Sequence, residues 1–565
     1  MMLFSSICLL SIIQQVSAEE KTPEQQNVPH FLYFILVDRF HNGDPNNDHT
    51  INLADPQDFH GGDLLGVETK LDYLWELGVD SIWLSPVFSM RTEKFHGHGA
   101  FHGYWVQSLD TIEPRFGGED ALFSLSQAVQ NKEMNLILDM VYNHVSFDSK
   151  MIDAHPDWFH HYPSITDWND PFQLTHYQVH GLPDLDQRRP PVYQYLLHRS
   201  LYWQKKAQVQ GFRIDAIRHM ENDFLSKLSQ DSNAWMLGED FNGNPASLIE
   251  RGQKTGLDAL FDFPLYYALT QDLCDLNQVS QIGSIISMDQ YYPKGFQLVR
   301  FLDNHDLPRI YSRCKENKEK VYQALAFIFS VQGIPMISYG TENWTKGEGE
   351  PENRSSLQWD SIDPNLTKAI KTLAMFRKTH LVLEKGSPKI IHYTKDQLVI
   401  EQDWSNQLSY TVLNLSAQNL IFSAPSEAKY IAGLEQHGEI IQPKQDMNFR
   451  SNTLSILVFE GAPHPSIETT IKITLETEKT SDFLLVGSSP DFGSWNPEKG
   501  IPLQKNAKNY SAEIPIQQNQ LISYKIVEKN GETYTWEQGE NHFLWTGENH
   551  PTNLTIQRNN EENEE

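Results

Sequence analysis

Residues 211–219 of the chain read Gly-Phe-Arg-Ile-Asp-Ala-Ile-Arg-His. Phe212 and Ile214 alternate with Arg213 and Asp215, a pattern typical of a short buried strand that carries charge at its C-terminal end. A buried charge without a partner is costly, so these charges must be paired or used in chemistry. Taken alone, the stretch is also compatible with an ordinary ion pair at the rim of any α/β sheet.

The length and charge of the chain limit what it can be. Its 565 residues are too many for one hydrophobic core, so we expect two to four domains. The formal net charge of −29 argues against a nucleic-acid or membrane partner, because both require basic residues that neutralise phosphate. A neutral partner such as a sugar is unaffected, and 11% aromatic residues suit stacking on flat ligands. We expect a monomer.

The first 18 residues predict a secretory signal peptide. They carry no charge, contain an apolar run from Leu3 to Ile13, and end in the small-x-small sequence Val16-Ser17-Ala18. A membrane anchor is the alternative, but the run is short for a span of about 20 residues. We therefore expect a secreted protein, extracellular or periplasmic.

Two cysteines would remain after removal of the signal peptide, because Cys8 leaves with it. Cys274 and Cys314 could form one disulfide or stay as two free thiols, and the sequence does not decide between them.

From Phe31 onward, short apolar segments alternate with amphipathic helical stretches such as 68–77, 119–132 and 318–331. Eight such alternations predict a (β/α)₈ barrel over residues 28–386, with its chemistry at the C-terminal ends of the strands. A doubly wound open sheet would give a similar alternation, although no glycine-rich phosphate loop supports a nucleotide fold. The expected strands are 31–37, 81–87, 135–141, 211–217, 235–238, 257–263, 297–302 and 334–339.

Other segments depart from this pattern. Residues 144–190 are too long for a structureless loop and predict a small subdomain inserted after the third strand. Residues 387–461 and 465–557 show short alternating strands, so we expect two all-β domains after the barrel. The acidic tail 558–565 has the composition of a disordered segment.

Three carboxylates follow three of the predicted strands. Asp215 ends the fourth strand, Glu239 follows the fifth, and Asp306 follows the seventh. At one barrel mouth they would repel one another unless basic groups neutralise them or one carboxyl stays protonated. Retaining glycoside hydrolysis needs such a set, with a nucleophile and an acid/base about 5–5.5 Å apart.

Four motifs stand out along the barrel segment: Asp139–Val145 (DMVYNHV), Gly211–His219 (GFRIDAIRH), Gly238-Glu239 and Phe301–Asp306 (FLDNHD). They are accompanied by His102-Gly-Tyr104-Trp105, Leu182-Pro-Asp184-Leu185, and Gly333–Gly340 followed by Asn353-Arg354. In these motifs and in their order, the chain resembles the α-amylase family, glycoside hydrolase family 13.

The resemblance implies roles for individual residues. Asp215 would be the nucleophile, Glu239 the general acid/base and Asp306 the stabiliser of the transition state. From its position on the strand, Arg213 should share a face with Asp215 and keep it ionised, whereas Glu239 must be protonated through a raised pKa. The implied substrate-binding residues are His102, Tyr104, Trp105, His144, Arg213, Arg218, His219, Phe241, His305 and Arg354.

The resemblance also implies bound Ca²⁺, a cation that prefers oxygen ligands. Asn143, Asp184 and the carbonyl of His219 match the site between barrel and inserted subdomain. A loop near the N-terminus is similar to a second calcium loop of cyclodextrin glucanotransferases, but an asparagine- and aspartate-rich turn without metal remains an alternative. Its residues are Asn42, Asp44, Asn47, Asp48, Gly61 and Asp63.

Some positions bear on specificity. Arg218 stands where the family often has Lys, and these side chains differ in geometry. Phe241 resembles the glucanotransferases, but His180 replaces their large central aromatic residue, and their extra domain is missing. We therefore expect an α-amylase that hydrolyses internal α-1,4 bonds of starch, glycogen or maltodextrin. The alternatives are a maltodextrin transglycosylase and a non-catalytic starch-binding protein.

Residues 467–556 resemble a family 20 starch-binding module. Trp495 and Trp536 would stack on consecutive glucose rings, with Lys525 and Asn541 as hydrogen-bonding partners. Such a module would raise the local concentration of substrate near the barrel. A β-sandwich whose tryptophans belong to its core is the alternative.

Overall fold

The structure is a computed structural model that describes residues 28–442, 447–464, 468–477, 479–506, 509–547 and 553–557. The predicted signal peptide (1–18) and acidic tail (558–565) lie outside these residues. Among the described residues, no helix is both long and apolar enough to cross a membrane.

Eight parallel strands form a closed barrel, in which each strand pairs with the next along the chain. The barrel closes because β8 pairs with β1, with Met336 opposite Leu32. The (β/α)₈ prediction is therefore confirmed, and the open-sheet alternative is wrong. The strands are β1 (Leu32–Ile35), β2 (Ser81–Leu84), β3 (Asn135–Met140), β4 (Gly211–Ile214), β5 (Trp235–Gly238), β6 (Ala259–Phe261), β7 (Gln297–Phe301) and β8 (Ile334–Ser338).

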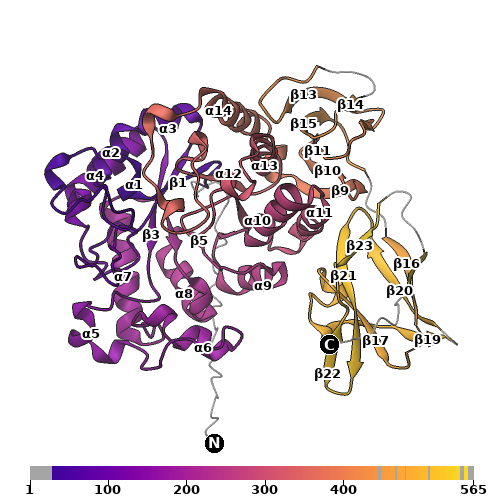
Figure 1. Ribbon diagram of the computed structural model, residues 1–565, viewed down its shortest axis with the longest axis horizontal. Coiled ribbons are helices and arrows are strands. Elements are labelled where there is room, and N and C mark those ends of the chain that lie inside the picture. The colour runs from indigo at the N-terminus through magenta and orange to yellow at the C-terminus, as the bar shows by residue number, and fades with distance from the viewer. Residues whose placement is uncertain are drawn as a thin grey trace, which may run out of the picture.

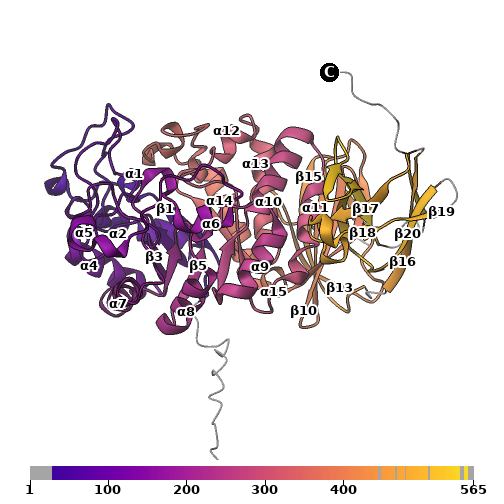
Figure 2. The ribbon, with the colours of Figure 1, turned by 90° about the horizontal axis from the view of Figure 1, so that it is seen from below.

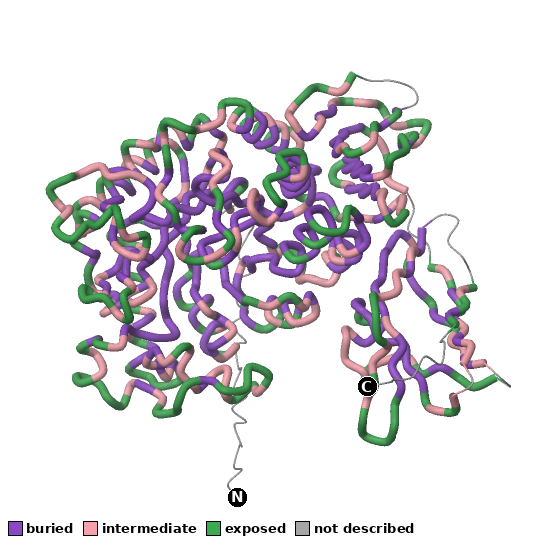
Figure 3. The backbone as a smooth tube through the Cα atoms, in the orientation of Figure 1, coloured by how far each residue is buried: buried purple, intermediate pink, exposed green. Residues whose placement is uncertain are grey.

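Helices surround the barrel (Figure 1), and the strands form the buried centre of the molecule (Figure 3). Residues 68–77, expected as one helical stretch, lie in two helices that meet at Lys70, where the backbone leaves helical geometry. The barrel-domain helices outside the insertion are α1 (Val37–Phe40), α2 (Leu64–Thr69), α3 (Leu71–Leu77), α4 (Gly118–Asn131), α7 (Pro190–Lys206), α8 (Asn222–Ser232), α9 (Pro245–Thr255), α10 (Phe263–Leu269), the π-helix η7 (Thr270–Leu276), α11 (Ser280–Ile286), α12 (Ile310–Arg313), α13 (Lys318–Ser330), α14 (Pro364–Thr379) and α15 (Val382–Lys385).

The insertion after β3 contains two short helices, α5 (Lys150–Ala154) and α6 (Pro171–His176). Its ends are tied together by a β-bridge between His144 and Asp184. This bridge keeps the inserted subdomain close to the end of β3, where one of the family motifs ends.

An antiparallel sheet follows the barrel, in the order β13-β15-β11-β10-β9, with a separate β12–β14 pair. We call this part domain C. Its strands are β9 (Ser387–Thr394), β10 (Gln397–Trp404), β11 (Gln407–Asn414), β12 (Leu420–Phe422), β13 (Lys429–Glu435), β14 (Met447–Phe449) and β15 (Thr453–Glu460).

The C-terminal module consists of two sheets around a separate apolar core. Seen from below, it lies at the opposite end of the molecule from α4 and α5 (Figure 2). Its strands are β16 (Glu468–Glu476), β17 (Asp482–Gly487), β18 (Ile501–Pro502), β19 (Gln504–Asn506), β20 (Asn509–Gln517), β21 (Leu521–Asn530), β22 (Thr533–Trp536), β23 (His542–Trp545) and β24 (Asn553–Gln557).

The structure decides the state of the two cysteines that the sequence left open. Cys274 in η7 and Cys314 directly after α12 form a disulfide. Both residues are buried. The bond joins η7 to the segment that follows β7, and that segment contains Asp306.

Candidate active site

The three carboxylates predicted from strand ends lie in one cleft. Asp215, Glu239 and Asp306 all line a cavity of about 970 Å³ at the C-terminal ends of the strands. Parallel strands in a barrel end on the same face, so residues far apart in the sequence meet there.

Arg213 holds two of these carboxylates at once. Its Nη1 donates to Oδ1 of Asp215 at 2.7 Å, and its Nη2 lies 2.8 Å from Oε1 of Glu239. Nη1 also donates to Asp139 at 2.9 Å. The Arg213 side chain is fully buried, and its fork geometry suits contacts with several carboxylates. The expectation that Arg213 shares a face with Asp215 is therefore confirmed.

Glu239 has the electrostatic environment of an acid. Its pKa is raised to about 8, chiefly by burial and also by the nearby charges of Asp215 and Asp306, although Arg213 lowers it. The backbone N–H of Ala216 donates to its Oε2 at 3.1 Å and fixes its orientation. Glu239 therefore carries a proton at neutral pH.

Asp306 has the opposite character. Burial alone would raise its pKa, but His305 and Arg354 outweigh that effect and lower it below the usual value. Arg354 Nη2 donates to Asp306 Oδ1 at 3.1 Å, and Nη1 of the same guanidinium pairs with Glu350 at 2.9 Å. Asp306 thus stays ionised beside a protonated Glu239.

A series of rings forms one wall of the cleft. Tyr104 and His305 stack with centroids 4.8 Å apart, and His102 lies between Tyr104 and Trp105. Burial lowers the pKa of His102 and His144, so these imidazoles are neutral. Neutral rings can both donate to and accept from sugar hydroxyls.

Other predicted residues lie on the side of the cleft next to Glu239. Arg218 donates to the carbonyl of Phe241 at 3.2 Å and to that of Trp168 at 3.4 Å. His219 lines the same wall, with its Nδ1 2.9 Å from the carbonyl of Leu174. Phe241 remains 39% exposed, which leaves its ring accessible to a ligand.

Asp139 and Trp168 are among the site residues that were not predicted as functional. Asp139 accepts from Arg213, from Trp83 at 3.1 Å and from the Tyr104 hydroxyl at 2.9 Å, so it positions the site from below. Its place at the end of β3, four residues before Asn143, was the available signal. Trp168 lines the cleft from the inserted subdomain and is 41% exposed. No spacing rule places an aromatic residue of an irregular insertion.

The N-terminal loop brings oxygen atoms together. Asn42 Oδ1, Asn47 Oδ1 and Asp48 Oδ1 are buried, and each lacks a hydrogen-bond partner within the described part of the chain. A Cβ at Gly61 would lie 2.6 Å from Asp48 Oδ1, so the glycine leaves room there. Asp63 differs from these three residues because both of its carboxylate oxygens accept hydrogen bonds. The backbone N–H of Gly43 donates to Oδ1 at 3.1 Å, and that of Asp44 donates to Oδ2 at 2.8 Å. Asp44 itself caps the next turn.

The predicted central calcium residues are also adjacent. Asn143 Oδ1 is buried and has no hydrogen-bond partner in the described ranges. The pKa of Asp184 is raised to about 7, chiefly by burial, although nearby His160 and Asn143 lower it. Asp184 Oδ2 is 2.6 Å from Nδ1 of His160. No group of three or more His, Cys, Asp or Glu that could hold a metal occurs among residues 28–557 as far as they are described. An ion in either place would depend on amide and carbonyl oxygens.

The tryptophan pair of the C-terminal module is accessible. Trp495 and Trp536 have ring centroids 6.2 Å apart and are half-buried, as is Asn541. Lys525 has a further task that was not expected: its ammonium donates to the carbonyls of Glu537 at 2.9 Å and of Gly539 at 2.7 Å. Lys525 therefore supports the segment between β22 and β23.

The barrel, the carboxylate trio and the ring-lined cleft define an enzyme that acts on glycosidic bonds. Comparisons with known proteins specify the family. The protein family described as "Alpha amylase, catalytic domain" matches residues 34–375, and the family described as "Starch binding domain" matches residues 466–556. The chain belongs to the α-amylase family and carries a starch-binding domain at its C-terminal end.

Individual relatives differ in their named activities. A cyclomaltodextrin glucanotransferase from Klebsiella oxytoca is 26% identical over 96% of each chain. An α-amylase from Schwanniomyces occidentalis is 28% identical and is matched over 76% of this chain and 88% of its own. The solved α-amylase of Anoxybacillus superposes with a TM-score of 0.71 at 27% identity, over 77% of this chain and 99% of that one. These relatives include hydrolases and transferases.

Proposed function

We propose that this protein is a secreted α-amylase that hydrolyses internal α-1,4-glucosidic bonds of starch and maltodextrins by double displacement. The observation that carries the proposal is the bridge formed by Arg213 between Asp215 and Glu239, with Asp306 in the same cleft. A single guanidinium contacts Asp215 and orients a second carboxyl, that of Glu239, whose pKa is raised.

The first chemical step uses Asp215 and Glu239. Asp215 Oδ attacks the anomeric carbon, while Glu239 gives its proton to the glycosidic oxygen, so the C–O bond breaks and the shortened glucan leaves. Asp306, held ionised by His305 and Arg354, stabilises the positive charge that develops on the sugar ring.

The second step reverses the roles. The Glu239 carboxylate takes a proton from a water molecule, whose oxygen attacks the anomeric carbon and releases Asp215. The product keeps its anomeric configuration, and Glu239 regains its proton.

The two oxygen-rich sites fit Ca²⁺. Asn42, Asn47 and Asp48 would hold one ion through the oxygens that lack partners, and Asn143, Asp184 and the His219 carbonyl would hold the other. Bound calcium would supply charge neutralisation that fixes the loops.

Transglycosylation is the second candidate. Phe241 and Trp168, joined through Arg218, place two exposed rings in the cleft that contains Glu239, where a sugar acceptor could replace water. His180, which lines the same cleft, offers a smaller apolar surface than an aromatic residue, and this favours hydrolysis.

One experiment tests the enzyme and its product class together. The parent and Asp215→Asn are incubated with soluble starch and with maltoheptaose, and reducing ends and products are followed over time. We expect reducing ends only from the parent, as linear oligosaccharides shorter than the substrate. Equal activity of both proteins would refute the nucleophile, and cyclic or lengthened products would establish the transferase.

Secretion is tested separately. Expression of the full-length chain in a bacterial host should yield a protein outside the cytoplasm whose N-terminus begins at Glu19, as N-terminal sequencing would show. An uncleaved chain retained in the membrane fraction would favour the anchor instead.

A further inference from the structure

The starch-binding module contacts the barrel through a buried residue. Leu521, the first residue of β21, is fully buried and belongs to the same apolar cluster as the barrel strands. The rest of the module's main apolar core, which includes Ile471 and Phe483, is a separate cluster. The contact is therefore part of the barrel's own core.

The partner of Leu521 is helix α11. A Cβ added at Gly283 would lie 2.8 Å from Leu521 Cδ2 and 3.2 Å from Leu398 Cδ1. Leu398 belongs to β10 of domain C, so barrel, domain C and module meet at one glycine. Only a residue without a side chain allows all three to approach this closely.

Polar contacts surround this apolar contact. The N–H of Leu521 donates to Ser287 Oγ at 2.9 Å, and Ser284 Oγ lies 3.4 Å from Ser488 Oγ. On the domain C side, the N–H of Ile390 donates to the carbonyl of Asn519 at 2.9 Å. These bonds fix the module against both α11 and β9, which lie next to it in Figure 1.

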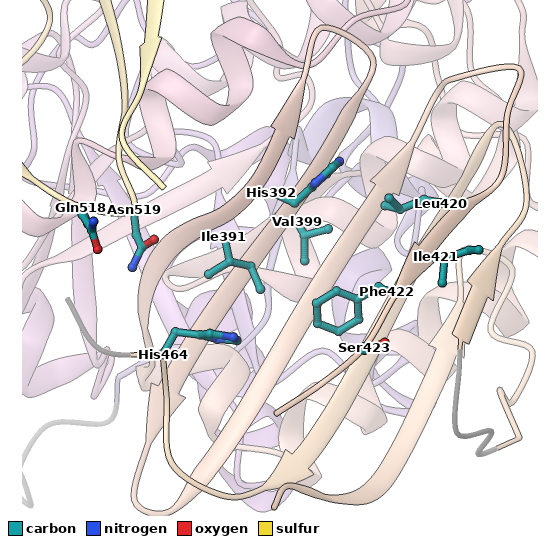
Figure 4. A pocket seen from close by; sticks show the side chains of 10 residues that line it. All are labelled: Ile391, His392, Val399, Leu420, Ile421, Phe422, Ser423, His464, Gln518 and Asn519. Atoms are coloured by element: carbon teal, nitrogen blue, oxygen red, sulfur yellow. The ribbon is translucent and has the colours of Figure 1, made fainter. Parts of the chain in front are cut away.

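The linker is held as well. His464 reaches the buried carboxylate of Glu401 through its backbone N–H at 3.0 Å and its Nδ1 at 2.6 Å, and Tyr410 donates to the same carboxylate at 3.0 Å. Figure 4 shows His464 on one side of a cavity of about 240 Å³, with Asn519 of the module on the same side and the domain C sheet behind it. The chain is thus fixed just before it enters the module.

We propose that the module and the barrel unfold as one cooperative unit, so that an α-glucan bound at Trp495 and Trp536 stabilises the catalytic centre. The proposal rests on the sugar-binding role of the tryptophan pair. A ligand that binds only the folded state shifts the unfolding equilibrium of everything that unfolds with its site. Domains joined by a loose linker would not share this effect, because each would unfold separately.

The experiment uses β-cyclodextrin as the probe and the full-length chain as the protein. Amide hydrogen exchange of β4 and β7 reports on the barrel, and exchange of β17 and β21 reports on the module, with or without probe. At about 100 times its dissociation constant, the probe should slow globally controlled exchange in both parts by about 100-fold. Calorimetry should show one transition that moves upward as a whole.

Four variants identify the path of this effect. Trp536→Ala removes one ring of the tryptophan pair, so the probe should no longer slow exchange in the barrel or in the module. Leu521→Asp should break the contact with α11, so that the probe protects the module alone and two transitions appear. The double variant Ser284→Cys/Ser488→Cys should form a cross-link and keep the coupled response. Gly283→Leu is a second uncoupling variant if Leu521→Asp does not fold.

Three results would overturn the coupling. The probe could slow exchange in the module alone in the parent, or it could still slow exchange of the barrel in both uncoupling variants. A full response in Trp536→Ala would show that the probe binds in the cleft instead. Exchange requires no turnover, so a parent without hydrolysis but with coupled protection would refute the proposed activity and leave the coupling intact.

Discussion

Nη2 of Arg213 lies 2.8 Å from Oε1 of Glu239, so the proposed general acid is held by a cation that also contacts the proposed nucleophile, Asp215. Glu239 nevertheless keeps a raised pKa, because burial and two neighbouring carboxylates outweigh this one contact. Arg213 therefore orients Glu239 without ionising it.

Replacement of Arg213 by lysine should lower kcat/KM on maltoheptaose by about 100-fold or more, because an ammonium lacks the forked geometry with which the guanidinium contacts Asp139, Asp215 and Glu239 at once. Steady-state kinetics measure the loss, and circular dichroism checks the fold. Arg218→Lys is the matched control, since the hydrogen bonds of Arg218 within the described residues go to the backbone carbonyls of Phe241 and Trp168, and its kcat should change far less. Similar losses in both variants would contradict the special role of Arg213.

The pH profile should show an alkaline limb with an apparent pKa near 8. Glu239 has a raised pKa, so its proton is present below that value and is lost as the pH rises through it, and the acid step then fails. The measurement is kcat/KM across the neutral-to-alkaline range. In the residual activity of Asp306→Asn the limb should move to lower pH, because one neighbouring negative charge is gone. A limb that stays at the same pH would contradict this electrostatic cause.

Calcium should stabilise the fold. Treatment with a chelator should lower Tm, and added Ca²⁺ should restore it, because the ion binds only the folded loops. Asp48→Ala should reduce the number of calcium ions per chain by one, as measured by metal analysis after dialysis. Asp44→Ala is its control, since the Asp44 side chain accepts from Asn46 in the same loop and caps a turn. Equal metal content in all three proteins would contradict the N-terminal site.

The disulfide should contribute to stability. Replacing Cys274 and Cys314 by serine should lower the free energy of unfolding by about 4 kcal/mol, because the bond spans 40 residues and restricts the unfolded chain. Denaturant unfolding measures the change, and the parent treated with a reductant after unfolding should show the same midpoint. An unchanged midpoint would mean that the thiols are not bonded in solution.

The sequence by itself determined the class of this protein. Eight apolar segments alternate with helical ones, and in a barrel the end of each strand must lie on one face, so Asp215, Glu239 and Asp306 could be assigned to one mouth. The strands and motifs can be recognised from the sequence because each is a pattern of residues that are neighbours in the chain. The observed strands fall within the predicted ranges and are mostly shorter at their ends.

Only the tertiary structure decided which side chains touch. The contact of Arg213 with both Asp215 and Glu239, the place of Trp168 in the cleft and the bond between Cys274 and Cys314 each depend on how distant segments pack. The same is true of Leu521 against Gly283, a contact that joins the module to the barrel core. The physical reason is that burial and close contact arise between surfaces far apart in the chain, and no local pattern encodes the distance between them.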